Sequence, residues 1–331
     1  MYVKDSDVYG VPEYFQLPRE TVDIQQGDCE DFAILMASLL RAKGQSTDEV
    51  YVVVGNAPSW LGGATHAWVL LRDGSDWLSI DPHGTIIADK LLAYYNPSVA
   101  FNDAYFGEPI EVRGNSPIDI VVTDPDGLIA SKQLNEIPHA WYSEVNIDGD
   151  GHMMDKVVIL DRKHGYYHIA VIPETGASPG DTYTLEVAAN GRAITIAESV
   201  PISDIPDQGY IVRSTEAELI QIIPVTIDCD PDVLNLRARG GLVTVYIELP
   251  EGFDVNEIDI SSTRLNGTVP ALSWATAIGD YNDNGIPDLM VKFDRRAVQA
   301  ILDVGESVEI TITGEVDGIP LMGTDTIRVI R

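Results

Sequence analysis

Cysteine and basic residues are both scarce in this sequence. Its 331 residues include two cysteines, Cys29 and Cys229, which lie far apart in unrelated contexts. We expect them in different domains and unpaired, so that disulfides do not hold the fold together and the redox compartment stays open. Lysine and arginine total 21 against 52 acidic residues, which gives a net charge of −31. This acidity disfavours nucleic acids and anionic membranes as partners, and suits cation binding, a salty medium or plain solubility.

Long apolar runs are also missing. No run reaches the roughly 18 residues of a membrane-spanning helix, and residues 1–5 lack the apolar core of a signal peptide. We therefore expect no membrane span, and the start fits either an intracellular chain or a piece of a longer one. Hydrophobic residues make up 45% of the chain, so it can bury several cores in the two or three domains expected at this length.

The first hundred residues predict an α+β domain. A loop-rich start, residues 1–28, precedes a helix over 29–43. Asp28 is the expected N-cap, Asp31 three positions later completes an arrangement like a capping box, and Gly44 ends the helix. Antiparallel strands are expected next, the first of them central, and a short helix follows. These elements span residues 50–55, 65–71, 77–81 and 87–95, within a domain of residues 1–109.

Two all-β sandwich domains are predicted after it, over residues 110–221 and 222–331. In the first, the proline-rich residues 201–221 form a connector. The expected strands of the first domain are 118–123, 142–146, 156–160, 166–172, 182–188 and 192–197. Those of the second are 225–228, 242–248, 290–293, 308–315 and 325–330. The predicted fold class is thus an α+β domain followed by two all-β sandwiches.

Cys29, His66 and Asp81 supply the parts of a cysteine acyl-transfer site. Cys29 opens the predicted helix, where the positive end of the dipole lowers a thiol pKa, although the adjacent acidic residues oppose this. His66 and Asp81 belong to neighbouring antiparallel strands, so the carboxylate can fix the imidazole tautomer. Each residue alone also fits a structural role, as a buried thiol, a core histidine or a turn aspartate. Their order and context together favour catalysis.

The motifs around these residues resemble the transglutaminase-like cysteine peptidase superfamily. Residues 27–40 (GDCEDFAILMASLL) resemble its nucleophile helix, residues 65–69 its histidine strand and residues 81–82 its aspartate strand. The resemblance covers residues 8–105 and implies a papain-like α+β core. It implies Cys29 as the nucleophile, His66 as general base and acid, and Asp81 as the residue that orients the imidazole.

Residues 13–21 also resemble the family, in which a residue ahead of the cysteine helps bind the oxyanion. Gln16 is our first candidate and Gln26 the second, with the backbone N–H of Cys29 as the other donor. His83 is an alternative base. The implied chemistry is attack of the thiolate on a carboxamide carbonyl to give a thioester. Water then completes hydrolysis, which we favour because prokaryotic relatives look mostly like peptidases or amidases, whereas an amine completes transamidation.

Two acidic loops predict structural calcium. Asp280, Asn282 and Asn284 repeat oxygen ligands at alternate positions before Gly285, and Asp288 closes the set. The full EF-hand loop is absent, since a valine occupies its twelfth position. A second version comprises Asn146, Asp148, Asp150 and Asp155. A solvated turn has a similar composition, so that reading stays open.

Residues 117–221 and 223–331 resemble β-sandwich modules appended to secreted prokaryotic proteins, which implies an extracellular or cell-surface location. The favoured function is a cysteine peptidase or amidase that acts on a protein or peptide substrate and associates with a surface through these modules. An inactive, calcium-braced adhesion protein and a transamidase that crosslinks surface proteins are the alternatives. Cys229 has acidic neighbours, which disfavour a thiolate, so we expect it to be unreactive.

Overall fold

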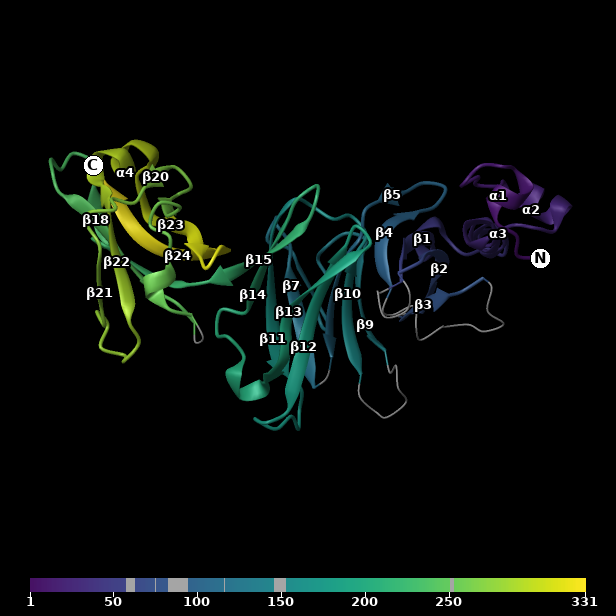
Figure 1. Ribbon diagram of the computed structural model, residues 1–331, viewed down its shortest axis with the longest axis horizontal. Coiled ribbons are helices and arrows are strands. Elements are labelled where there is room, and N and C mark those ends of the chain that lie inside the picture. Colours follow the sequence, from purple (N-terminus) through teal and green to yellow (C-terminus); the bar gives the residue numbers. More distant parts are fainter. Residues whose placement is uncertain (58–62, 75, 83–94, 116, 146–152, 251–252) are drawn as a thin grey trace. The chain divides into compact units, whose positions relative to one another are not determined.

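The computed structural model describes residues 1–57, 63–74, 76–82, 95–115, 117–145, 153–250 and 253–331 (Figure 1). In this part the chain is mostly β, with few helices. It divides into two compact units, one formed by residues 1–205 and 212–220, the other by residues 206–211 and 221–331. No helix among the described residues has the length and apolar character needed to cross a bilayer. The domain boundary near residue 109 stays a prediction.

Three helices and a 3₁₀ turn open the first unit: α1 (Asp5–Val8), α2 (Pro18–Ile24), α3 (Cys29–Ala42) and η1 (Thr47–Glu49). Helix α3 confirms the prediction, and Gly44 just beyond it adopts a positive φ of 108°. The loop-rich start predicted for residues 1–28 is wrong where α1 and α2 form. Pro18 occupies the first helical position, where its missing N–H has no consequence, and the side chain of Glu20 accepts the backbone N–H of Leu17 at 2.8 Å.

The N-terminal sheet has the strand order β3-β2-β1-β4-β5, with β1 central as predicted. Its strands are β1 (Val50–Asn56), β2 (Thr65–Asp73), β3 (Asp76–Ile80), β4 (Asn96–Phe101) and β5 (Phe106–Gly107). Alternate residues of β1 face opposite sides. Val50 and Val52 pack with Ala33 and Ala37 of α3, while Tyr51 and Val53 pack on the other face. The helix predicted over 87–95 falls almost entirely outside the described residues.

Gly55 permits a close contact within this sheet. It pairs with His66 of β2 on one side and lies at a register shift against β4 on the other. A Cβ at this position would collide with the carbonyl oxygen of Asn96. The approach of β4 to β1 therefore requires glycine, and it fixes the sheet around the histidine strand.

Gly55→Ala is expected to destabilise the first unit by about 1–3 kcal/mol, the usual range for overpacking a tight site. Thermal melting of the full chain measures the change. The matched control is Gly180→Ala, because a Cβ at residue 180 would meet open space. Equal melting temperatures for the two variants would contradict the proposed role of the Asn96 contact.

The rest of the first unit is built from two further sets of strands. They are β6 (Ile110–Asn115), β7 (Ile118–Thr123), β8 (Ile129–Ser131), β9 (Ala140–Val145), β10 (Met154–Ile159), β11 (Gly165–Pro173), β12 (Thr182–Ala189), β13 (Arg192–Pro201) and β14 (Tyr210–Ser214). The first two residues of β14 belong to the second unit. One sheet runs β13-β12-β6-β10-β9, and the other includes β14-β11-β7-β8. Burial alternates along β7 and through much of β11, as expected for strands with one face in a core.

The connector predicted over residues 201–221 is partly wrong. Strand β14 forms within it, and a 3₁₀ turn, η4 (Ile202–Asp204), precedes β14. The prolines that suggested irregular structure, Pro201 and Pro206, lie outside β14. The β-branched residues of β14 are therefore free to form a ladder.

The second unit is also mostly β. Its elements are β15 (Leu219–Pro224), β16 (Thr226–Asp230), β17 (Val233–Asn235), β18 (Leu242–Glu248), η5 (Val255–Glu257), β19 (Arg264–Leu265), β20 (Val269–Pro270), β21 (Ala277–Gly279), β22 (Asp288–Asp294), α4 (Arg295–Ile301), β23 (Gly305–Val316) and β24 (Ile319–Ile330). The first two residues of β15 belong to the first unit. One sheet has the order β16-β18-β22-β21, and β20-β19-β23-β24-β15 lie in that order in another, where β17 also pairs with β24. Helix α4 was not predicted; the side chain of Asp294 caps it by accepting the N–H of Ala297 at 2.9 Å.

Candidate active site

His66 and Asp81 lie together, as the sequence predicts. His66 is the second residue of β2, Asp81 directly follows β3, and these strands pair antiparallel. Nε2 of His66 lies 3.2 Å from Oδ2 of Asp81, and each side chain is 18% exposed. The carboxylate is therefore placed to hold Nε2 and to fix the orientation of the imidazole ring.

Cys29 is the first residue of α3 and packs, half-buried, against the cluster that includes Ala67 of β2. The backbone N–H of Ala67, the residue after His66, acts on the sulfur and favours the thiolate. Burial and the neighbouring Glu30 carboxylate act more strongly and raise the pKa of Cys29 to about 12. In this state the thiol donates to Oε2 of Glu30 at 3.4 Å. The helix and the histidine strand thus meet at the sulfur, and acidic groups surround it.

Tyr95 contacts the histidine. Its ring centroid lies 5.8 Å from that of His66 and 5.7 Å from that of Trp68. Arg113 of β6 fixes this segment, since its guanidinium donates to the carbonyl of Tyr95 and, at 3.0 Å, to Oδ1 of Asn96. Strand β6 therefore supports one side of the candidate site.

Gln16 is buried next to the start of α3. Its backbone N–H donates to Oδ1 of Asp31 at 2.7 Å, and Oδ2 of Asp31 accepts the N–H of Asp28 at 3.2 Å. Gln16 is 1% exposed, and neither the nitrogen nor the oxygen of its side-chain amide has a hydrogen-bond partner. Gln26, the second candidate, is half-buried. A buried amide without a partner is rare, so Gln16 retains hydrogen-bonding capacity for a ligand.

Asp31 joins these segments at close range. A Cβ on Gly27 would lie 2.7 Å from its Oδ2, so glycine is required where the chain passes this carboxylate. Both oxygens of Asp31 accept backbone N–H groups. Its role is therefore to hold the residue 16 segment against the first turn of α3.

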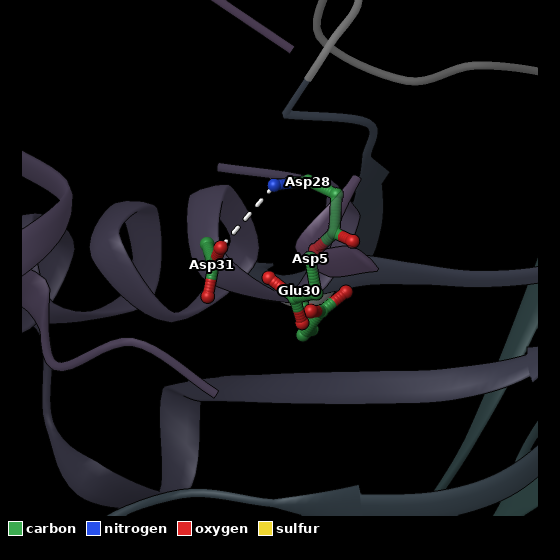
Figure 2. Close-up of side chains that lie close together, drawn as sticks. All are labelled: Asp5, Asp28, Glu30 and Asp31. Atoms are coloured by element: carbon green, nitrogen blue, oxygen red, sulfur yellow. Dashed lines mark hydrogen bonds between the residues drawn. The ribbon is translucent and has the colours of Figure 1, made fainter. Parts of the chain in front are cut away.

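Four acidic side chains lie close together near the start of α3: Asp5, Asp28, Glu30 and Asp31 (Figure 2). One oxygen from each lies within 4.8 Å of the others, and all four residues are buried. Asp5 Oδ1, Asp28 Oδ1 and Glu30 Oε1 have no hydrogen-bond partner. Burial raises the pKa of Asp5 and of Asp31, and it raises that of Glu30 to about 9, with a contribution from its hydrogen bond to Asp28.

This acidic cluster was missed in the sequence. Three members flank Cys29 within four residues, and that run of acids was a usable signal for a cation site. Asp5 belongs to α1, and nothing local indicates that it joins them. Unpartnered carboxylate oxygens are the ligands that calcium prefers, so the residues present fit a calcium ion.

Residues 2–82 match the family model of the transglutaminase-like superfamily. We call residues 2–82 the transglutaminase-like region, after the family model that they match. The match contains Gln16, Cys29, His66 and Asp81, and it confirms the resemblance stated from the sequence. A search of curated proteins found no match to the chain.

Solved structures give weaker likenesses. Calcium-bound LapG of Legionella pneumophila is 24% identical over 32% of this chain and 59% of its own, with a TM-score of 0.28. The mouse nectin-like molecule 4 ectodomain is 10% identical over 68% of this chain and 95% of its own, with a TM-score of 0.19. The N-terminal domain of the Streptococcus gordonii adhesin Sgo0707 is 9% identical over 87% of this chain and 77% of its own, with a TM-score of 0.21. The chain thus spans less than two thirds of LapG.

All the calcium ligands predicted from the sequence lie outside the transglutaminase-like region. Both oxygens of Asp280 and the oxygens of Asn282 and Asn284 accept backbone N–H groups of their own loop. Asp288 Oδ2 accepts the N–H of Tyr281 at 2.8 Å. Calcium in this loop stays a prediction.

Asn146, Asp148 and Asp150 of the second predicted loop lie outside the described residues, as does the alternative base His83. Asp155 is described. It lies in β10, completely buried, and takes part in a different acidic cluster, with Asp119, Glu144 and Glu174.

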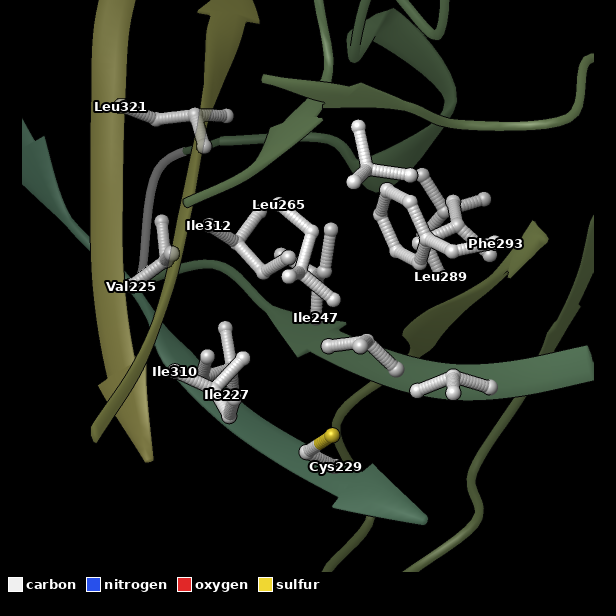
Figure 3. Packing of buried hydrophobic residues seen from close by; sticks show 14 of the residues in the cluster. Val225, Ile227, Cys229, Ile247, Leu265, Leu289, Phe293, Ile310, Ile312 and Leu321 are labelled. Carbon is white, nitrogen blue, oxygen red and sulfur yellow. The ribbon is translucent and has the colours of Figure 1, made fainter. Parts of the chain in front are cut away.

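Cys229 lies in the hydrophobic core of the second unit, among residues that include Ile227 and Ile310 (Figure 3). It is 0% exposed. Burial, and then the nearby Asp325, raise the pKa of this thiol to about 12. The core position agrees with the prediction of an unreactive thiol.

Proposed function

We propose that the chain is a transglutaminase-like cysteine peptidase or amidase with Cys29 as its nucleophile. The observation that carries the proposal is the 3.2 Å pair of His66 and Asp81, held on the strand whose next residue, Ala67, contacts the Cys29 sulfur. A thiol at a helix start, an imidazole and a carboxylate that orients it form a nucleophile-activating set. The family match of residues 2–82 supports the assignment.

In the proposed reaction the Cys29 sulfur attacks the carbonyl carbon of an amide while its proton passes to Nδ1 of His66. Asp81 holds Nε2 and stabilises the imidazolium. The C–N bond then breaks, and the imidazolium returns the proton to the leaving amine, which leaves a thioester on Cys29. Water, deprotonated by the imidazole, attacks the thioester. The C–S bond then breaks, the acid is released, and the imidazolium returns the proton to the Cys29 sulfur.

The oxyanion of both steps needs preorganised donors. The backbone N–H of Cys29 at the start of α3 is one. The side-chain amide of Gln16 is the other, because it is buried beside this turn and its nitrogen has no partner. Asp31 positions both segments, so the pair is held without its own carboxylate entering the chemistry.

Calcium is the proposed cofactor of the acidic cluster, with Asp5, Asp28 and Glu30 as the residues that hold it. When bound, the ion supplies positive charge next to the sulfur and offsets the carboxylates that disfavour a thiolate. Asp31 is the least suited ligand, because both of its oxygens already accept N–H groups.

Alkylation by iodoacetamide at neutral pH, with calcium present, tests the proposal. Mass spectrometry of digested full-length protein is expected to find the label on Cys29 and not on Cys229, which is buried in a core. Cys29→Ser is the control and should take up no label. Label on Cys229 with none on Cys29 would reject Cys29 as the nucleophile.

Hydrolysis and amine transfer share the thioester and differ in what attacks it. We propose hydrolysis of a protein or peptide substrate, at an extracellular or cell-surface location. Incorporation of an added fluorescent amine into substrate protein, dependent on Cys29, would instead identify a transamidase.

A further inference from the structure

A second acidic cluster lies in the sandwich-like part of the first unit. It comprises Asp119 of β7, Glu144 of β9, Asp155 of β10 and Glu174, which follows β11. One carboxylate oxygen from each lies within 4.8 Å of the others. None of the four belongs to the region that carries Cys29.

The cluster joins strands of two sheets (Figure 1). Asp155 and Glu144 stand directly opposite each other in the β10–β9 ladder, so their side chains leave the same face. Asp119 lies on β7 of the other sheet. The N–H of Glu174 donates to the carbonyl of Pro117 at 3.1 Å, which holds it at the start of β7.

Asp155 is the unexplained member of the cluster. It is 0% exposed, and neither of its carboxylate oxygens has a hydrogen-bond partner within 3.5 Å. Burial raises the pKa of Asp155 to about 7, an effect that the hydroxyl of Tyr142 opposes only in part. An unpaired buried carboxylate is strongly destabilising, so a ligand that supplies positive charge there has a large effect.

Lys132 supplies only part of that charge. Its Nζ lies 3.2 Å from Asp119 Oδ1 and 2.7 Å from Glu144 Oε1. The hydroxyl of Tyr142 lies 3.4 Å from the same Asp119 oxygen. One ammonium thus contacts two of the four carboxyl groups, and neither oxygen of Asp155 has a hydrogen-bond partner within 3.5 Å.

We propose that Asp119, Glu144, Asp155 and Glu174 form a calcium site that links the two sheets. Calcium accepts six to eight oxygen ligands in flexible geometry, and four carboxylates offer up to that number. The sequence predicted Asp155 as a calcium ligand together with the loop that begins at Asn146. In the proposed site Asp155 binds calcium together with Asp119, Glu144 and Glu174 instead. The site does not depend on the acyl-transfer proposal, because the ion here would brace the fold and take no part in catalysis.

Calcium titration of the full-length chain by calorimetry tests this site. Asp155→Asn and Glu174→Gln are each expected to lower the calcium affinity of this site at least about tenfold. Loss of a residue that only hydrogen-bonds to a metal ligand already costs about that much, and loss of a ligand itself should cost more. Glu198→Gln is the matched control, being an exposed residue of β13 in the same unit. Lys132→Met should strengthen binding several-fold, because it removes a competing positive charge.

Asp155→Asn combined with Asp5→Asn separates the two clusters. The proposal expects each substitution to weaken its own binding event and to leave the other unchanged, so that the two effects add. Unchanged calcium binding in both Asp155→Asn and Glu174→Gln would overturn the site, even if Asp5→Asn still removes an event. If Asp155→Asn fails to fold, Glu174→Gln decides alone, since that side chain is only partly buried.

Discussion

Replacing His66 with alanine is expected to slow alkylation of Cys29 by about 10²- to 10⁴-fold, the range for loss of a positioned general base. The sulfur is buried next to acidic groups that favour its neutral form. The His66 imidazole is the base proposed to take the proton of this thiol, and its pairing with Asp81 holds it in place on β2. The second-order rate constant with iodoacetamide, at neutral pH in calcium, measures the effect.

His164→Ala is the matched control for this experiment, because His164 is exposed and lies outside the transglutaminase-like region. Asp81→Asn is expected to slow the reaction as well, since an asparagine amide can donate to Nε2 and fix the wrong tautomer. An alkylation rate in His66→Ala equal to that of the intact chain would show that the pair has no part in activating Cys29.

Local pattern explains why the core of the site was predictable. Cys29 stands where a capped amphipathic run begins, and the strands of His66 and Asp81 follow each other with a short connection. Neighbouring antiparallel strands place such residues together without long-range information. The structure bears this out in the order of β1, β2 and β3 and in the distance between the two side chains.

Other features depend on contacts that sequence pattern does not encode. Asp5 reaches the Cys29 region only because α1 and the first turn of α3 pack together, and Asp119 meets Asp155 only across two sheets. Gln16 was chosen by resemblance, and its buried amide without a partner is visible only in the structure. The short helices α2 and α4, of seven residues each, offered too little periodicity to detect.

The same contrast applies to calcium. The sequence favoured loops in which oxygen-bearing residues alternate, yet the oxygens of the Asp280 loop already accept backbone N–H groups. The clusters with unpartnered buried oxygens draw on separate elements instead. Alternation along the chain also produces ordinary turns, whereas an unpaired buried carboxylate is difficult to explain without a ligand.

Removing calcium from the Cys29 cluster is therefore expected to destabilise the first unit. An ion that binds only the folded state contributes about 2.7 kcal/mol when its concentration is 100 times its dissociation constant. The measurement is thermal melting with calcium and with a chelator, in an Asp155→Asn background so that the second cluster does not contribute. Asp5→Asn should abolish the calcium-dependent shift, because it removes one of the three unpartnered carboxylates.

Asp7→Asn is a close control, since Asp7 lies on the same helix, α1, two residues away and exposed. In the Asp5→Asn variant the amide oxygen can still accept the N–H of Tyr14, as the carboxylate does, so the fold around the cluster should persist. The alkylation rate of Cys29 adds a local readout. Calcium should raise it in Asp7→Asn but not in Asp5→Asn, because the ion is the positive charge that opposes Glu30 and Asp28 at the sulfur. If calcium leaves the alkylation rate of Cys29 unchanged in both variants, the acidic cluster has a role other than cation binding. Activation of the Cys29 thiol would then rest on His66 alone.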